Sequence, residues 1–456
     1  MKKTCKLLLL GTALATTMTI SAAAANFTHC ADSLHAMDLF SGTENGYELD
    51  RAPTRAEAAV MLVRLLGGEK DATANTYETP FTDVPTWAAP YVGWLYHNNL
   101  TAGATETTYD TEGACTAQMY ATFLMRSLGY TDTGDNADFS YSNSLTFAKE
   151  KGVVDDFNCD PENFLRDDVV AMSYTALATQ PKDGKNDTLL DQLVASGAVD
   201  ATKAKSTQDT FKAYNEYTEL SKKMTDVTDM AMNMKMSMDM KLNDANLAKA
   251  DMDMNVQANM DMENLDNSKL AMKGKITMNL DESLVEEGQQ AQQTMDMEAY
   301  FTNGAYYVKS GDQKIKTEMS VQDMMDGMGL SEMVNTVEPI SLFKSIAKNS
   351  DGSYKIEYAA SSMNDMIANI LTSAGMTADM GSMTFDNVAI TVTPENGQPK
   401  SMAADMDCSV NVMDQKIDMA ITLNYDITAT GSSVKVTLPS DLDTYTDMIG
   451  GTNTPA

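Results

Sequence analysis

The second half of the chain alternates hydrophobic and polar residues with a period of two. Because successive side chains of a β-strand point to opposite faces, each such stretch predicts a strand with one apolar and one wetted face. The turn pairs Asn303-Gly304 and Asn396-Gly397 predict antiparallel hairpins. A sheet of about nine or ten strands is therefore expected, and its apolar face needs a second layer. The alternating stretches cover residues 232–242, 252–262, 270–280, 295–301, 354–358, 388–392, 402–412, 417–425 and 434–438.

Helical spacing predicts the elements around this sheet. A helix over residues 208–229 precedes the first strand, with Phe211, Tyr214 and Tyr217 on its apolar stripe. Three later segments are candidates for the second layer. They cover residues 321–334, 340–348 and 363–374.

The first half of the chain contains a repeated helical unit. Thr54 and Glu57 form a capping box, which predicts that a helix begins there. Arg55 and Glu57 correspond to Arg166 and Asp168 in another copy. Three copies predict a repeat architecture. Their apolar stripes lie at residues 59, 62, 63 and 66, at residues 121, 124, 125 and 128, and at residues 170, 173, 174 and 177.

These patterns predict a multidomain fold, with an all-α N-terminal module of three repeats followed by an α+β domain. The α+β domain is expected to be a large curved antiparallel sheet, an open half-barrel covered by helices. Three lysines, an apolar stretch and three alanines predict a cleaved secretory signal at the start of the chain. The expected divisions are a signal at 1–25, repeats at 26–68, 78–130 and 136–181, a linker with a short helix at 182–206, the Met-rich domain at 207–445 and a flexible tail at 446–456.

Composition separates the two halves and excludes some partners. Of 37 methionines, 30 follow residue 223, while both tryptophans precede residue 100. The formal charge of -32 excludes nucleic acid as a partner, because binding it requires a basic face. Beyond the signal, no apolar run is long enough to span a membrane, so an integral membrane protein is not expected.

The chain offers little for catalysis or for metal binding. The motifs of a nucleophile elbow, a zinc protease and a phosphate-binding loop are missing from the sequence, so we expect neither an enzyme nor a cofactor. The Met-x-Met spacing could hold copper(I), but the same alternation elsewhere uses valine, isoleucine and leucine, so no metal is expected. The disulfide pairing stays open among the cysteines beyond the signal, which are Cys30, Cys115, Cys159 and Cys408.

Each helical unit resembles a surface-layer homology (SLH) repeat. The resemblance rests on the stretch 81–84, which reads Phe-Thr-Asp-Val, on the Trp-Ala pair at Trp87 and on the Thr-Arg-Ala-Glu signature that begins at Thr54. It implies a secreted protein of the bacterial cell wall or surface that binds secondary cell-wall polysaccharide, typically its pyruvylated sugars. By this resemblance the binding residues would be Thr54, Arg55, Glu57, Asp83, Trp87, Gly103, Arg166 and Asp168.

Two interpretations of Arg55 and Trp87 stay open. Arg55 at a helix N-terminus could hold a sugar carboxylate by two hydrogen bonds, and Trp87 could stack on the sugar ring. Alternatively, Arg55 is solvated and Trp87 fills the core of the module. The second unit has Ala117 in place of the arginine, so at most two such sites are expected.

The C-terminal part resembles the LolA and LppX group of lipid-binding proteins in the order of its elements. The resemblance implies a half-barrel that holds a lipid or another apolar ligand, and flexible methionines suit a lining of variable shape. Alternatively, the methionines form a packed core, and the protein is a structural surface-layer protein whose C-terminal domain is an interaction module without a ligand. The expected lining residues are Met234, Met236, Met238, Met254, Met260, Met272 and Met278.

Overall fold

The computed structural model describes residues 27–225, 227–261, 263–285, 290–318, 320, 338–361, 364, 383–412 and 415–447. The chain divides into two compact units. The helical unit contains residues 24–215 and 338–347, and the sheet unit contains residues 1–23, 216–337 and 348–456. The predicted signal at 1–25 and helices at 321–334 and 363–374 lie outside the described residues, apart from Asn364.

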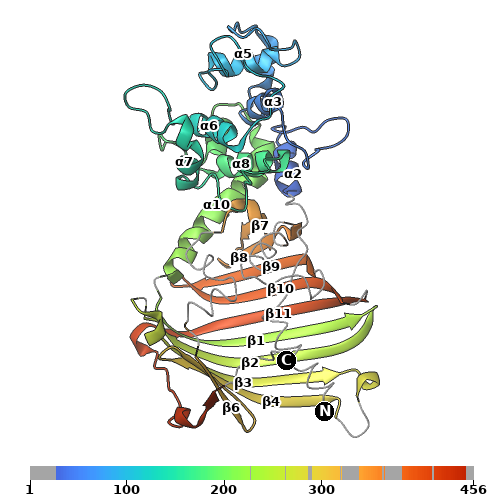
Figure 1. Ribbon diagram of the computed structural model, residues 1–456, viewed down its shortest axis with the longest axis vertical. Helices are drawn as coiled ribbons and strands as arrows, with labels where there is room; N and C mark the ends of the chain where they lie inside the picture. The colour runs from blue at the N-terminus through green and yellow to red at the C-terminus, as the bar shows by residue number, and fades with distance from the viewer. Residues whose placement is uncertain are drawn as a thin grey trace, which may run out of the picture. The chain divides into compact units, whose positions relative to one another are not determined.

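The helical unit is built around one central helix (Figure 1). Every residue of α8 from Arg166 to Leu177 is buried, so other elements pack around its whole circumference. Thr54 and Thr116 cap α3 and α6 through their side chains, as the sequence predicts for Thr54. The described helices are α2 (Thr28–Ala36), α3 (Arg55–Leu65), α4 (Glu69–Ala74), α5 (Ala89–His97), α6 (Ala117–Ser127), α7 (Ser144–Glu150), α8 (Arg166–Ala178), α9 (Leu189–Ala195) and α10 (Ala201–Thr225).

The segment expected to be a linker packs within the helical unit. Leu189, Leu190 and Leu193 of α9 are buried, and Thr188 caps this helix by accepting from the Asp191 amide at 3.0 Å. The long helix α10 begins earlier than predicted, and the division between the two units falls inside it.

Among the described residues the sheet contains twelve strands, and the two strands at its ends, β12 and β7, do not pair with each other (Figure 1). Its order is β12-β6-β5-β4-β3-β2-β1-β11-β10-β9-β8-β7. The first strand, β1, therefore pairs with β11, the last long strand, in the middle of the sheet. Only β12 and β6 are paired in parallel among the described registers. The strands are β1 (Asp229–Leu242), β2 (Ala245–Asn259), β3 (Lys269–Leu280), β4 (Gln292–Thr302), β5 (Ala305–Ser310), β6 (Gln313–Glu318), β7 (Phe343–Lys348), β8 (Tyr354–Tyr358), β9 (Met383–Glu395), β10 (Gln398–Val412), β11 (Gln415–Thr430) and β12 (Thr446–Asp447).

Two predictions about this region are wrong. Residues 340–348 form a 3₁₀ turn, Ile340–Leu342, followed by β7, because a short apolar run does not distinguish a helix from a strand. Residues 434–438 form no strand. Of the predicted tail at 446–456, the structure describes only the two residues of β12, so that prediction stays a prediction.

Residues 338–347 belong to the helical unit through specific contacts. The Ser341 carbonyl accepts a hydrogen bond from His29 Nε2 at 2.8 Å. The hydroxyl of Tyr214 donates to the Glu338 carbonyl at 2.9 Å, and Phe343 packs against the Tyr214 ring. The N-terminal helical residues therefore fold together with a segment that lies more than a hundred residues later in the chain.

The four described cysteines are all buried and unbonded to one another. Burial raises the pKa of the Cys115 thiol to about 12. These side chains therefore act as small apolar groups within the two units.

Candidate functional site

Arg55, the first residue of α3, is buried with only 7% of its surface exposed. Its Nε donates to the Tyr109 carbonyl at 2.8 Å, and its Nη1 lies 3.0 Å from the sulfur of Met119. The guanidinium carbon lies 5.0 Å from the centre of the Tyr109 ring. The side chain thus joins α3 to the loop before α6, and its predicted role in holding a carboxylate stays a prediction.

Arg166, the first residue of α8, makes the same kinds of contact. It is 3% exposed, and its Nε donates to the Tyr47 carbonyl at 3.0 Å. Its Nη1 lies 3.8 Å from the sulfur of Met61, and its guanidinium carbon lies 5.7 Å from the centre of the Phe40 ring. Burial lowers the pKa of this guanidinium from its usual value. The two carbonyl acceptors belong to tyrosines 62 positions apart (47 and 109), which is the spacing of the first two predicted repeats.

Backbone amides at the starts of α3 and α8 follow the same pattern. In each helix the first two amides donate to carbonyls of a loop from another predicted repeat. Neither amide pair is therefore left for a bound anion. The two acceptor pairs are again offset by 62 residues (51 to 113, and 49 to 111). The bonds are Arg55 to Gly113 at 2.8 Å, Ala56 to Thr111 at 3.2 Å, Arg166 to Arg51 at 2.9 Å and Asp167 to Leu49 at 3.0 Å.

Thr54 and Glu57 form the predicted capping box. The Thr54 hydroxyl accepts from the Glu57 amide at 3.2 Å, and Glu57 Oε2 accepts from the Thr54 amide at 2.9 Å. Glu57 also receives two hydrogen bonds from Arg51, at 2.9 and 2.6 Å. Burial alone would raise the pKa of Glu57, but these bonds from Arg51 and Thr54 hold it below its usual value. Both predicted site residues therefore stabilise the helix start.

Asp168 has an equivalent place at the start of α8. Its carboxylate accepts from the amides of Leu165 at 2.6 Å and Asp160 at 2.8 Å. Burial raises the pKa of Asp168 to about 6, against the effect of these two hydrogen bonds. This side chain therefore holds the loop before α8 onto the helix.

Asp83 and Gly103 shape the loop that Arg55 also contacts. The Asp83 carboxylate accepts from the amides of Tyr109 at 2.7 Å and Asp110 at 2.6 Å. Gly103 has a φ of +82°, and a Cβ there would lie 2.3 Å from the Phe81 ring, so only glycine fits. Arg55 and Asp83 thus both hydrogen-bond the backbone of Tyr109.

Trp87 is the aromatic residue among the predicted binding residues, and it is 53% exposed. An exposed indole presents a large apolar face and one hydrogen-bond donor. The alternative that Trp87 fills the core is wrong. Trp87 is therefore the predicted binding residue whose ring is available to a ligand in solution.

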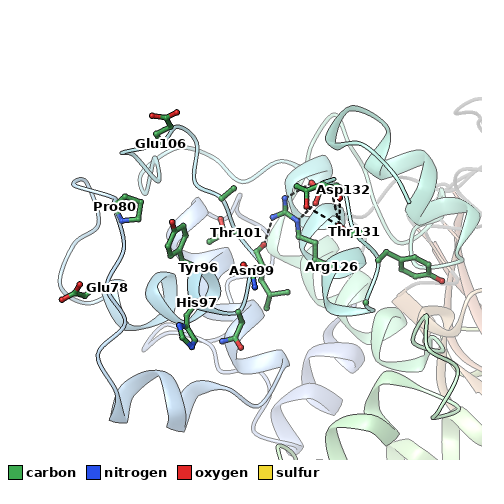
Figure 2. A pocket seen from close by; sticks show the side chains of 16 residues that line it. Glu78, Pro80, Tyr96, His97, Asn99, Thr101, Glu106, Arg126, Thr131 and Asp132 are labelled. Carbon is green, nitrogen blue, oxygen red and sulfur yellow. Dashed lines mark hydrogen bonds and ion pairs between the residues drawn. The ribbon is translucent and has the colours of Figure 1, made fainter. Parts of the chain in front are cut away.

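A groove in the helical unit, which we call the α5–α6 groove, was not predicted from the sequence (Figure 2). Its volume is about 970 Å³. Residues 96–102, from the end of α5 and the turn after it, line one side. Arg126 and residues 129–133, from the end of α6 and the loop after it, line the other, and Glu78, Pro80 and Glu106 complete the lining.

Arg126 connects the two sides of the α5–α6 groove through the Leu100 carbonyl, and Asp132 on its own side holds it in place. Arg126 donates to both carboxylate oxygens of Asp132, at 2.9 and 2.7 Å, and to the Leu100 carbonyl at 2.8 Å (Figure 2). Their side chains are only 15% and 8% exposed. Burial would raise the pKa of Asp132, but Arg126 holds it below its usual value. Helical spacing gives no signal for this groove, because Tyr96 lies four residues after Val92 and therefore on the same stripe as the buried Val92 and Leu95.

The predicted methionine lining lies almost wholly on one face of the sheet. Met234 is opposite Met254, and Met238 is opposite Ala250, which is opposite Met278. Met272 follows on the same face through its pairing with Val256. Residues directly opposite in adjacent strands share a face. Alternate residues along one strand also share a face, so Met236, between Met234 and Met238, belongs to it as well. Met260, the remaining member of the predicted set, lies just beyond the end of β2.

Burial along this face is uneven. Met238, Met254 and Met278 are buried, whereas Met234, Met236 and Met272 are half-buried. Met238 packs with Cys408 and Met419. That an apolar ligand covers the half-buried methionines of this face stays a prediction.

Within the described ranges, no three His, Cys, Asp or Glu side chains gather in a way that could hold a metal ion. None of the described helices is long and apolar enough to cross a membrane.

Comparison with known proteins finds two partial relatives. The chain is 31% identical over 100 residues to the Middle cell wall protein of Brevibacillus brevis, which covers 21% of this chain and 10% of that protein. It is 29% identical over 123 residues to the Surface layer protein of Brevibacillus choshinensis, which covers 25% of this chain and 11% of that protein. The matched segments thus span about a tenth of these relatives. No protein-family model matches the chain.

Solved structures give only remote likenesses. The S-type phycobiliprotein lyase CPES from Guillardia theta is 7% identical, with a TM-score of 0.19, over 48% of this chain and 97% of that one. A DUF1329 family protein from Desulfovibrio piger is 8% identical, with a TM-score of 0.18, over 50% of this chain and 95% of that one. Likenesses at this level carry no argument about fold or function.

Proposed function

We propose that this protein acts at the bacterial cell surface, where the helical unit holds it non-covalently on cell-wall polysaccharide. The observation that carries the proposal is the partial similarity to two Brevibacillus proteins named for the cell wall and the surface layer. The paired contacts of Arg55 and Arg166 support a helical unit made of related repeats. The role proposed is binding, and it includes no catalytic step.

Trp87 is the contact that we assign to the wall polymer. Its exposed ring offers an apolar face on which a sugar can stack, whereas Arg55 and Arg166 have their Nε donors on internal carbonyls. The two arginines would then contribute indirectly, by holding together the surface that carries Trp87.

Co-sedimentation of the exported full-length chain with purified cell walls tests this proposal. We expect Trp87→Ala to weaken binding about tenfold, because exposed aromatic anchors often dominate binding energy. Tyr141→Ala is the matched control, because Tyr141 is another exposed aromatic residue of the same unit, at 47%. Failure of the unsubstituted protein to sediment would refute wall binding, and equal loss with both substitutions would refute the assignment of Trp87.

We also propose that the sheet unit binds a hydrophobic ligand such as a lipid. The half-buried methionines Met234, Met236 and Met272 on one face of the sheet support this, because they present flexible apolar surface. The alternative is a surface-layer protein whose sheet unit is a packed interaction module without a ligand.

Native mass spectrometry separates these alternatives. The full chain should be used, because residues 338–347 fold with the helical unit and a cut near residue 206 would separate them from most of that unit. A stoichiometric apolar adduct from an exporting host supports ligand binding. A clean mass, with no uptake of a fluorescent fatty acid added afterwards, supports the packed module.

A further inference from the structure

We propose that the α5–α6 groove binds an uncharged glycan chain. This inference rests on the proposed function in one respect, because it assigns a ligand class and a second contact surface to the helical unit. The groove is separate from the predicted binding residues, since none of them lines it.

The size and the rigidity of the groove fit an extended polar ligand. Its volume of about 970 Å³ lies at the upper end of the range for small-molecule sites, which leaves room for more than one sugar ring. The hydrogen bond from Arg126 to the Leu100 carbonyl connects the two sides, and the ion pair with Asp132 fixes the position of Arg126. A groove held in this way is formed before the ligand arrives, so binding does not require the walls to be ordered.

The lining combines an aromatic ring with neighbouring amide groups. Tyr96 lies on one side of the groove (Figure 2). It is 38% exposed, and a T-shaped contact with Phe81 holds its ring in place. The next residues, His97, Asn98 and Asn99, are exposed along the same side. A sugar presents an apolar ring face and many hydroxyl groups, so an aromatic ring beside amide donors and acceptors matches both.

The charges of the groove favour an uncharged ligand over an acidic one. Glu78 and Glu106 lie exposed on the outer side, and neither appears in an ion pair among the described residues (Figure 2). Arg126 directs three donors to Asp132 and Leu100, so the groove's arginine is already neutralised. A carboxylated sugar would meet two carboxylates of like charge, which disfavours it.

Calorimetric titration of the full chain with defined oligosaccharides tests the inference. The uncharged probe is a tetramer of N-acetylglucosamine, a tetramer of glucose is a second uncharged probe, and a tetramer of galacturonic acid is the acidic one. We expect at least one uncharged tetramer to bind, and the acidic tetramer to bind about tenfold more weakly. Equal or tighter binding of the acidic tetramer overturns the inference, and so does the absence of binding by both uncharged tetramers up to millimolar concentration.

Two variants locate the binding. Tyr96→Ala should weaken binding of the uncharged tetramer about tenfold, whereas Tyr141→Ala, outside the groove, should leave it unchanged. The double variant Glu78→Gln with Glu106→Gln removes both charges but keeps hydrogen-bonding groups. Its affinity for the acidic tetramer should be close to its affinity for the uncharged one. This second variant keeps the test decisive if Tyr96→Ala disturbs folding. Unchanged binding in both variants would place the glycan elsewhere and overturn the inference.

The wall assay distinguishes the failure of this inference from the failure of the proposed function. If the full chain sediments with walls but no uncharged tetramer binds, wall attachment stands and the assignment of the α5–α6 groove is wrong. If the tetramer binds in the groove but the chain does not sediment, the groove is a glycan site of a protein that is not attached to the wall.

Discussion

The helical unit and the sheet unit bury their side chains in different ways. In the helical unit α8 is buried along twelve consecutive residues, and even Arg166 has a carbonyl partner inside. In the sheet unit β1 buries only Ala231 and Met238, while its other methionines are half-buried. Fully partnered buried groups specify one arrangement, whereas a half-buried methionine face tolerates several. The helical unit is thus a fixed support for surface sites, and the sheet unit offers an adaptable surface.

Removing a buried arginine should give the largest effect on the helical unit. Arg166→Ala leaves the Tyr47 carbonyl without this donor and opens a cavity beside Met61, so we expect a loss of about 3 kcal/mol or more in unfolding free energy. Urea unfolding followed by tryptophan fluorescence measures this, because both tryptophans, Trp87 and Trp94, lie in the helical unit.

The matched control is Arg64→Ala. Arg64 pairs with Glu69 at 2.8 Å near the surface, with side chains 24% and 40% exposed, so its loss should cost about 1 kcal/mol or less. Unchanged stability in Arg166→Ala together with lost wall binding would contradict a structural role. The arginine would then be a ligand-binding group, as the sequence resemblance implies.

A pH titration should reveal the contact between α2 and residues 338–347. Burial lowers the pKa of His29 to about 4, against the hydrogen bond to the Ser341 carbonyl and the charge of Asp32, while Lys344 lowers it further. Below the ordinary histidine pKa the unfolded chain therefore binds a proton that the folded chain does not. Stability is then lost as the pH falls from about 6.5 to about 4, by roughly 3 kcal/mol at most.

His29→Gln keeps a side-chain N–H for the Ser341 carbonyl but does not titrate. The difference in unfolding free energy between the two proteins, followed by urea unfolding across this pH range, should therefore shrink steadily toward low pH. Asp155 and Asp168, whose pKa values burial raises to about 6, act in the opposite direction, but they are common to both proteins and cancel. A constant difference would show that His29 is not held neutral in the folded state.

Long periodic segments could be predicted from the sequence, and contacts between distant segments could not. The alternation over 232–242 and 270–280 predicted β1 and β3 because burial of one face imposes a period of two. Residues 340–348 were wrongly predicted as a helix, since their burial depends on His29 and Tyr214 far away in the chain.

The candidate sites show the same limit. The anion-binding role predicted for Arg55 from its position at a helix start stays a prediction, and its contact with the Tyr109 carbonyl could not be predicted, because nothing in a linear pattern shows which loop faces a helix end. Trp87 was predicted as a sugar contact, and the structure exposes it. The α5–α6 groove joins residues about thirty positions apart, so it was visible only after folding.

Methionine substitutions on the sheet should give the smallest effects and sharpen the comparison between the units. Met238→Ala removes a buried side chain that packs with Cys408 and Met419, so we expect a loss of about 2 to 3 kcal/mol. Met236→Ala removes a half-buried side chain of the same strand and should cost about 1 kcal/mol. Urea unfolding followed by far-ultraviolet circular dichroism measures both.

The same pair distinguishes a ligand surface from a packed core. If the half-buried methionines line a ligand site, Met236→Ala should reduce uptake of a fluorescent fatty acid by more than Met238→Ala does, although it costs less stability. If the sheet is only packed mass, any change in uptake should follow the loss of stability. Equal costs for the two substitutions would mean that this face is buried as uniformly as α8, and the contrast between the two units would disappear.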